Sequence, residues 1–163
     1  MTAPDQFVPG RPPPAPLRLR EVGPSTVREA GEVWNRIGAP YGWTGRSAWS
    51  VREWQEELAR PGVRVWIAMV EQELAGLVEL EAEPSGDVGI TYFGLVPEFI
   101  GRGFGGALLT MATDLAWTMT APSGEPVRRV WLQTSSRDHP HALPNYEARG
   151  FRVFRTQRRS ASA

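Results

Sequence analysis

A glycine-rich turn that runs into an apolar helix is the feature that most constrains this chain. Four glycines lie within the six residues from Gly101 to Gly106, and the apolar run that begins at Ala107 predicts a helix. Such a turn leaves backbone N–H groups open at the helix N-terminus, where the helix dipole adds roughly half a positive charge. Phosphate and pyrophosphate groups bind well in that setting. The pattern therefore predicts a phosphorylated cofactor.

The composition predicts one soluble globular domain, with 163 residues of which 41% are hydrophobic. No stretch reaches the roughly 18 apolar residues of a membrane helix, so we expect no membrane partner. The 18 basic residues balance 18 acidic ones, and a chain without net charge has no general attraction for nucleic acid. The absence of cysteine excludes disulfides, thiolate catalysis and cysteine-bound zinc. With no pattern of an export signal, we expect a cytoplasmic protein.

The two ends of the chain differ from the rest. Six of the first 16 residues are prolines, which cannot join the interior of a helix or a sheet. We therefore predict a disordered, polyproline-like arm over residues 1–16 and a folded domain over residues 17–157. Residues 158–163 are predicted to form a flexible tail.

Within the domain, hydrophobic periodicity and the positions of glycine and proline predict a mixture of helices and strands without an internal repeat. In chain order these are a strand at 17–20, helices at 24–37 and 47–59, strands at 63–71, 74–83 and 87–96, the glycine turn and its helix at 101–120, a strand at 127–134, a short helix at 142–149 and a final strand at 151–156.

One interpretation of the turn is a dinucleotide-binding fingerprint, because Gly101, Gly103 and Gly106 satisfy the spacing G-x-G-x-x-G. In a dinucleotide-binding unit, however, the glycines follow the strand directly, whereas residues 97–100 intervene here. The acidic residue expected at the end of the next strand is also missing, since residues 132–135 are neutral. A dinucleotide-binding redox domain is therefore the weaker alternative. The lack of a lysine after the glycines excludes a P-loop.

The order of the predicted elements instead resembles that of the GNAT superfamily of acyl-CoA-dependent N-acyltransferases. The family's cofactor motif, Gln/Arg-x-x-Gly-x-Gly/Ala, is similar to the segment from Ile100 to Gly105, with Ile100 at the Gln/Arg position. The resemblance implies an α+β fold of three layers, in which a central mixed, mostly antiparallel sheet is flanked by helices and splayed at the cofactor cleft. It also implies acetyl-CoA as the cofactor. The residues of the turn expected to bind it are Ile100, Gly101, Arg102, Gly103, Phe104, Gly105 and Gly106.

A second segment carries the same resemblance. Residues 142–151 are similar to the family's Leu-Tyr-Glu-Lys-x-Gly-Phe, and Tyr146 falls on the tyrosine that in many members protonates the departing CoA thiolate. The partner of that tyrosine in many members is an asparagine seven residues earlier, and His139 stands in its place at the expected cofactor site. The backbone groups that would polarise the thioester carbonyl and pair with the pantetheine arm are those of Phe93, Gly94 and Leu95.

Acyl transfer to an amine also needs a base or a proton relay, because only the neutral amine is a nucleophile. Several relatives carry a glutamate where this chain has Gly89. Glu79 and Glu81 alternate with Val78 and Leu80, which puts both carboxylates on one face of the neighbouring strand. Either could relay a proton through water, with Glu81 favoured because it is nearer the strand end. A solvated sheet face is the alternative for each.

Three aromatic residues, Tyr41, Trp43 and Trp49, lie in the loop between the first two helices and at the start of the second. In the family this segment often walls the acceptor site. An aromatic wall would suit a hydrophobic or aromatic amine, or a cation over a ring. Packing in the core is the alternative for these residues.

The leading hypothesis is an N-acetyltransferase that moves an acetyl group directly from acetyl-CoA to a primary amine, carried by a small molecule or a peptide N-terminus. The alternative is a catalytically weak acyl-CoA-binding or regulatory module of the same fold, which Gly89 and Ile100 favour. We expect no metal, because His139 and His141 have no third ligand near them in the sequence. The resemblance leaves a homodimer open.

Overall fold

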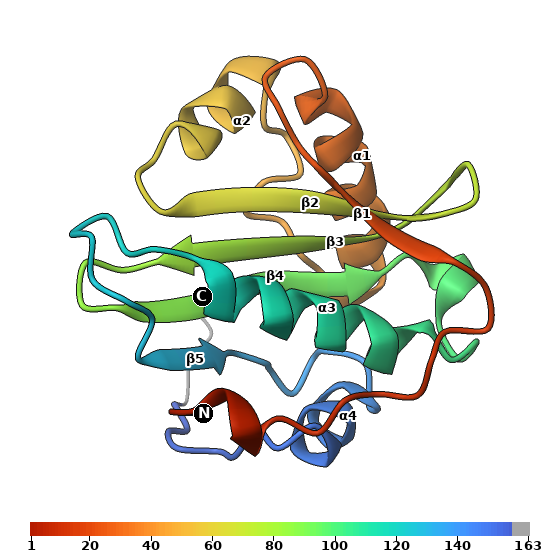
Figure 1. The fold of residues 1–163 in the computed structure, drawn as a ribbon. Coiled ribbons are helices and arrows are strands. Elements are labelled where there is room, and N and C mark those ends of the chain that lie inside the picture. The colour runs from red at the N-terminus through yellow and green to blue at the C-terminus, as the bar shows by residue number, and fades with distance from the viewer. Residues whose placement is uncertain (158–163) are drawn as a thin grey trace.

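The computed structural model describes residues 1–157, which form a sheet with helices on both faces (Figure 1). No helix in this part of the chain is both long enough and apolar enough to cross a membrane. The elements are β1 (Leu17–Glu21), α1 (Val27–Gly38), α2 (Val51–Leu58), β2 (Val63–Val70), β3 (Glu73–Ala82), β4 (Asp87–Leu95), α3 (Phe104–Thr118), β5 (Arg129–Leu132) and α4 (Ala142–Ala148), with 3-10 turns at Pro4–Gln6, Ala39–Tyr41 and Pro97–Phe99.

The central strands β3 and β4 are covered from both sides. Leu77 of β3 and Ile90 of β4 are buried, as is Leu108 of α3, which packs on the sheet from one face. On the other face, Ile37 of α1 lies so close to Gly94 that a Cβ on that glycine would be 2.6 Å from it. The apolar residues therefore form two layers of core, one above and one below the sheet.

The sheet divides between β4 and β5. Strands β1 to β4 pair antiparallel in sequential order, whereas β4 and β5 run parallel and pair only over residues 87–90 and 129–132. From Thr91 to Leu95, β4 continues with no strand on this edge among residues 1–157. A mixed, mostly antiparallel sheet that splays at this point confirms the predicted α+β, three-layer fold.

A buried ion pair holds β4 at the point of division. The register with β3 skips Thr91, which is therefore the extra residue of a β-bulge. The Thr91 hydroxyl donates to Glu79 Oε1 at 2.9 Å, and the Arg46 guanidinium donates to both Glu79 oxygens, at 2.5 and 3.1 Å. Glu79 is only 1% exposed, so its charge depends on these bonds in place of water.

Arg46 reaches the sheet because α2 starts later than the predicted residue 47. The Ser50 side chain accepts a hydrogen bond from the Glu53 N–H, and the Glu53 carboxylate accepts one from the Ser50 N–H. This reciprocal capping box fixes the helix start at Val51. The residues before it form a loop that packs on the sheet.

The predicted strand over residues 151–156 is wrong. Within residues 1–157 no strand forms there, and the side chains of Val153 and Phe154 are exposed. The outer edge of β5 is instead paired with Met1, whose amino group donates to the Val130 carbonyl at 2.7 Å while the Val130 N–H donates to the Met1 carbonyl at 2.9 Å. The edge that a last strand would need is therefore already occupied.

Residues 1–16, predicted to be a disordered arm, are described in one conformation. After the turn at Pro4–Gln6 the arm passes between α3 and α4 before it enters β1 (Figure 1). The Val8 N–H donates to the Arg149 carbonyl at 3.0 Å, and the Gly10 N–H donates to Thr110 Oγ1 at 2.9 Å. The domain limits stay predictions, and the predicted tail at 158–163 lies outside the described residues.

Replacement of Arg46 by alanine should destabilise the fold by about 3–5 kcal/mol, because it leaves the Glu79 carboxylate buried without its cation. Arg52→Ala is the matched control, since Arg52 pairs with Glu56 on the surface and its side chain is 86% exposed. Such a pair contributes less than about 1 kcal/mol. Urea denaturation followed by circular dichroism measures the unfolding free energy of both variants. Equal losses would contradict a stabilising role for the buried Arg46–Glu79 ion pair.

Candidate active site

The N-terminus of α3 presents free backbone donors. Gly101 and Gly103 have φ angles of 75° and 88°, in the left-handed region that favours glycine. Gly103 is the N-cap of α3 and has no side chain that could accept a hydrogen bond from the helix. The first N–H groups of a helix also have no partner inside it. The turn therefore fits an anionic group such as a pyrophosphate, which accepts hydrogen bonds from several N–H groups at once.

Three elements meet beside this turn, and we call the line along which they meet the groove. A Cβ added to Gly105 would lie 3.9 Å from Asn145 of α4 and 3.9 Å from Leu95 of β4. One added to Gly106 would lie 3.7 Å from the Arg149 guanidinium, just beyond α4. The start of α3, the end of β4 and helix α4 thus converge where the sheet divides.

The larger side chains of the turn are engaged in packing. Arg102 donates to the Glu98 carbonyl at 3.1 Å, and its guanidinium lies 4.9 Å from the centre of the Phe99 ring. Phe104 is buried against the same ring, at 5.5 Å between centroids, and Ile100 packs on the core. Of the predicted cofactor residues in the turn, the glycines and the backbone therefore remain for ligand binding.

Tyr146 of α4 faces β4 at the division of the sheet. Its ring packs edge-on against Phe93, with 6.0 Å between centroids, and the residue is buried. Burial raises the pKa of the Tyr146 hydroxyl, and the negative charge of Asp138 raises it further. The phenol therefore stays protonated throughout the physiological range, so that it can donate a hydrogen bond or a proton.

The predicted strand segment at Phe93, Gly94 and Leu95 has one edge that no other strand of residues 1–157 pairs with. On the other edge these residues pair with Val78, Leu77 and Gly76 of β3 in register. Successive side chains point to opposite faces, so Phe93 contacts Tyr146 while Gly94 admits α1 from the other side. The free backbone groups can pair with an extended ligand.

Asp138 brings a negative charge close to two tyrosines. Burial raises the pKa of Tyr41, and the Asp138 charge adds to that effect, as it does for Tyr146. The Asp138 carboxylate also accepts a hydrogen bond from the Ser135 N–H at 2.8 Å, which fixes it in the turn before α4. The charge of Asp138 therefore acts both on Tyr41, in the 3-10 turn after α1, and on Tyr146 of α4.

His139 is part of the turn that leads into α4. Its Nδ1 accepts a hydrogen bond from the His141 N–H at 3.1 Å, and its carbonyl accepts one from the Ala142 N–H at 2.8 Å. The structure therefore gives this predicted cofactor residue a local role. In the part of the chain described, no group of three or more side chains is arranged to hold a metal.

The two predicted proton relays are both held by arginines. Both Glu79 oxygens accept hydrogen bonds from Arg46. Glu81 forms an ion pair with Arg60 and lies opposite Gly89, which is four residues, or about 13 Å of strand, from Phe93. A role for either in proton transfer stays a prediction, and these distances and bonds weigh against it.

Two of the predicted acceptor residues belong to an aromatic cluster around Arg46. Trp43 lies 5.4 Å from Tyr92 between ring centroids, and Trp49 lies 5.3 Å from Trp54. The Arg46 guanidinium stacks over Trp49 at 4.5 Å and over Tyr92 at 4.4 Å. The aromatic rings thus already hold a cation, the Arg46 guanidinium, where a cationic acceptor was expected. The third predicted acceptor residue, Tyr41, is not part of this cluster.

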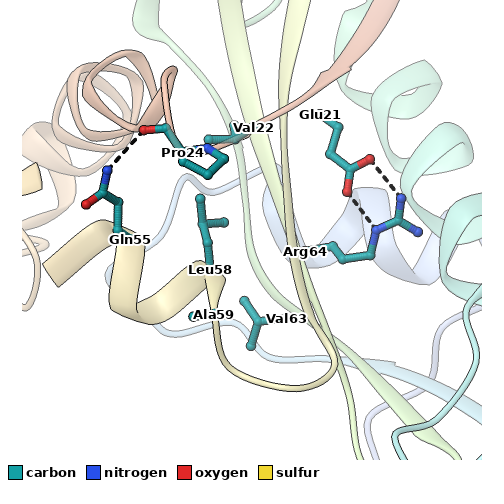
Figure 2. A pocket seen from close by; sticks show the side chains of 8 residues that line it. All are labelled: Glu21, Val22, Pro24, Gln55, Leu58, Ala59, Val63 and Arg64. Atoms are coloured by element: carbon teal, nitrogen blue, oxygen red, sulfur yellow. Dashed lines mark hydrogen bonds and ion pairs between the residues drawn. The ribbon is translucent and has the colours of Figure 1, made fainter. Parts of the chain in front are cut away.

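A shallow hollow of about 220 Å³ lies at the other end of the sheet (Figure 2). It is lined in part by Gln55, which donates to the Pro24 carbonyl at 3.2 Å, and by the ion pair of Glu21 and Arg64. Val63 also lines it and pairs with Glu81, at the opposite end of β3 from the residues that pair with Phe93–Leu95. This hollow is therefore separate from the groove beside the glycine turn.

Comparison with known proteins agrees with this geometry. A family model described as "Acetyltransferase (GNAT) family" matches residues 29–151. A comparison with curated proteins finds no match.

Several solved structures share the fold at low sequence identity. An aminoglycoside acetyltransferase from an uncultured soil metagenomic sample, in complex with sisomicin, has a TM-score of 0.69 and 12% identity over 90% of this chain and 95% of that one. An aminoglycoside N-acetyltransferase in complex with CoA has a TM-score of 0.60 and 16% identity, over 91% and 99%. A ribosomal-protein-alanine N-acetyltransferase from Brucella melitensis biovar Abortus 2308 has a TM-score of 0.61 and 14% identity, over 90% and 100%. Since the family model spans most of the domain, from α1 to the residue after Gly150, the chain belongs to the GNAT acetyltransferase family.

Proposed function

We propose that this protein is an N-acetyltransferase that transfers the acetyl group of acetyl-CoA directly to a primary amine. The observation that carries the proposal is the position of Tyr146, which contacts Phe93 where β4 leaves β5, beside the open N-terminus of α3. A proton donor, a free strand edge and a set of anion-binding N–H groups thus border one groove. Family membership supports the same reaction class.

Different residues of the groove bind different parts of acetyl-CoA. The N–H groups at the start of α3 bind the pyrophosphate, and the free edge at Phe93–Leu95 pairs with the pantetheine arm and polarises the thioester carbonyl. The amine nitrogen bonds to the acyl carbon as the carbon–sulfur bond breaks. Tyr146 then donates a hydrogen bond to the sulfur. Because burial raises its pKa, hydrogen bonding to the thiolate contributes more than full proton transfer.

The amine proton leaves to water in this proposal. The nearest buried carboxylate, Glu79, has both oxygens bonded to Arg46, and Glu81 is paired with Arg60. The acceptor therefore reacts as the free amine, whose fraction rises with pH. The proton that it loses and the one that the CoA sulfur finally takes are both exchanged with solvent.

The acceptor is a cationic amine before it reacts. The Asp138 carboxylate near Tyr41 and Tyr146 attracts such a cation to the mouth of the groove. Solved relatives named for aminoglycoside and for ribosomal-protein-alanine acetylation represent a small-molecule amine and a peptide N-terminus. An assay of thiol release from acetyl-CoA with sisomicin and with a peptide bearing N-terminal alanine distinguishes the two classes.

A catalytically weak acyl-CoA-binding module remains the second candidate. Gly89 supplies no carboxylate, and a Cβ there would lie 2.9 Å from the Trp131 ring, so the position is filled by packing. Tight binding of CoA without thiol release for any amine in the panel would favour this module over the enzyme.

Gly105→Glu should weaken CoA binding by about 100-fold or more, because the carboxylate would repel the pyrophosphate at short range. A glutamate in the first turn of a helix suits the helix dipole, so the fold should be retained. Gly105→Gln is the control of equal size without the charge and should bind more tightly than the glutamate variant. Isothermal titration calorimetry measures both, and equal affinities for CoA would contradict an anion site.

Tyr146→Phe should lower kcat by about 10²-fold, at the low end of the range for acid–base groups, with little change in KM for acetyl-CoA. The ring contact with Phe93 is kept, so packing does not account for the loss. Because the pKa of Tyr146 is raised above its usual value near 10, the wild-type rate should show no fall from this group below pH 10. An unchanged kcat would return Tyr146 to a purely structural role.

Glu81→Gln should leave the pH profile of kcat/KM unchanged. Wild type and variant should both gain activity as the acceptor amine deprotonates, since Glu81 lies about 13 Å along the strand from Phe93. Steady-state kinetics from pH 6 to pH 10 make the comparison. Loss of the acidic limb in the variant alone would instead establish Glu81 as the proton relay.

A further inference from the structure

The N-terminal arm lies along the groove beside the glycine turn. Its Gly10 approaches the backbone of Gly106 so closely that a Cβ on Gly10 would lie 2.5 Å from the Gly106 carbonyl carbon and oxygen. Four residues later, Pro14 Cδ lies 3.7 Å from the position of a Cβ on Gly103, the N-cap of α3. The segment from Gly10 to Pro14 therefore crosses the first turn of α3, where the free N–H groups are.

Two hydrogen bonds hold this segment in the groove. The Gly10 N–H donates to Thr110 Oγ1 at 2.9 Å, on the next turn of α3. From the opposite wall, Arg149 Nη1 donates to the Pro9 carbonyl at 3.0 Å. The arm is thus fastened to both walls, α3 and the end of α4, and Figure 1 shows its path between them.

The backbone of the arm offers hydrogen-bond acceptors, as a pyrophosphate does, whereas the charged side chain of this segment, Arg11, is an exposed cation. Prolines at 9, 12, 13 and 14 contribute carbonyl acceptors without N–H donors. The walls of the groove supply donors, namely the first N–H groups of α3 and the Arg149 guanidinium. Arg149 Nε is buried and has no hydrogen-bond partner among residues 1–157, so the arm satisfies this side chain only in part.

We propose that residues 9–14 occupy the pyrophosphate part of the cofactor groove, so that the arm and CoA compete for it, and that Arg149 exchanges the Pro9 carbonyl for a phosphate when CoA binds. The inference rests on the proposed cofactor. It adds a binding residue, Arg149, an anchor for the arm, Thr110, and a regulatory segment to that site. The apparent affinity for CoA is then the intrinsic affinity multiplied by the fraction of molecules in which the arm is released.

Two variants release the arm without a change in the glycine turn. Gly10→Val puts a branched side chain against the Gly106 backbone, which cannot give way, whereas Thr110→Val removes the acceptor of the Gly10 N–H. Gly23→Val is the matched control, since a Cβ there meets nothing within 4 Å. Calorimetry with CoA is run on the full chain of each variant, with circular dichroism to verify the fold.

Both release variants should bind CoA more tightly than wild type, by about tenfold if the arm is seated in nine molecules out of ten. Gly23→Val should bind as wild type does. Affinities equal to or weaker than wild type in both release variants would overturn the competition, and weaker binding would make the arm a strap that retains the cofactor. CoA binding to none of the proteins would instead refute the proposed cofactor, and with it the competition.

The role of Arg149 is tested in the released background. Gly10→Val with Arg149→Gln should bind CoA about tenfold more weakly than Gly10→Val alone, because one charge-assisted hydrogen bond to a phosphate is lost. Arg152→Gln in the same background controls for the loss of a positive charge on an exposed side chain nearby. Equal affinities of the Arg149 and Arg152 double variants would show that Arg149 does not bind the phosphate.

Discussion

The bond between the Thr91 hydroxyl and the Glu79 carboxylate stands at the place where the sheet divides. Pairing of β4 with β5 ends one residue earlier, at Ile90, and the bulge at Thr91 turns the remainder of β4 away. The carboxylate can be buried there only because Arg46 supplies its cation. The loop before α2 and the two central strands are therefore joined at the point where the sheet divides. Loss of the Arg46 cation should therefore shift the end of β4 as well as lower the stability of the fold.

This arrangement also explains why one strand can support two different surfaces. Along β4 the side chains alternate, so Tyr92 faces the cluster around Arg46 while Phe93 faces Tyr146. The Glu79 carboxylate on the first surface belongs to the ion pair, and Tyr146, the proposed proton donor, lies on the second. In the mechanism that we propose, the acid–base chemistry thus depends on Tyr146 and on solvent. Both oxygens of Glu79 accept hydrogen bonds from Arg46, and the residue is buried, so its carboxylate serves the fold.

Local signals predicted the elements well, and long-range contacts set the limits of prediction. The glycines from Gly101 to Gly106 predicted the turn and α3, since positive φ and a free helix end are properties of a few adjacent residues. The strand at 151–156 failed because its partner edge on β5 is taken by Met1, 129 residues from Val130 in sequence. Arg46 gave no signal at all, because its partner Glu79 lies 33 residues away. Tyr146 was found only through the resemblance of its segment to a known family.

The arm illustrates the same limit in a different way. Its prolines predict that it forms neither helix nor strand, but they do not predict where it lies, because that depends on Thr110 and Arg149, which are 100 and 140 residues from their partners. Proline nevertheless affects what the arm can bind, because it supplies a carbonyl oxygen and no N–H group. A segment that offers carbonyl oxygens and few N–H groups complements a surface rich in free donors. The carbonyl oxygens of the arm are neutral acceptors, whereas the oxygens of a pyrophosphate are charged. Charged acceptors make the stronger hydrogen bonds. Such a segment can therefore occupy an anion site and still yield it to the anion.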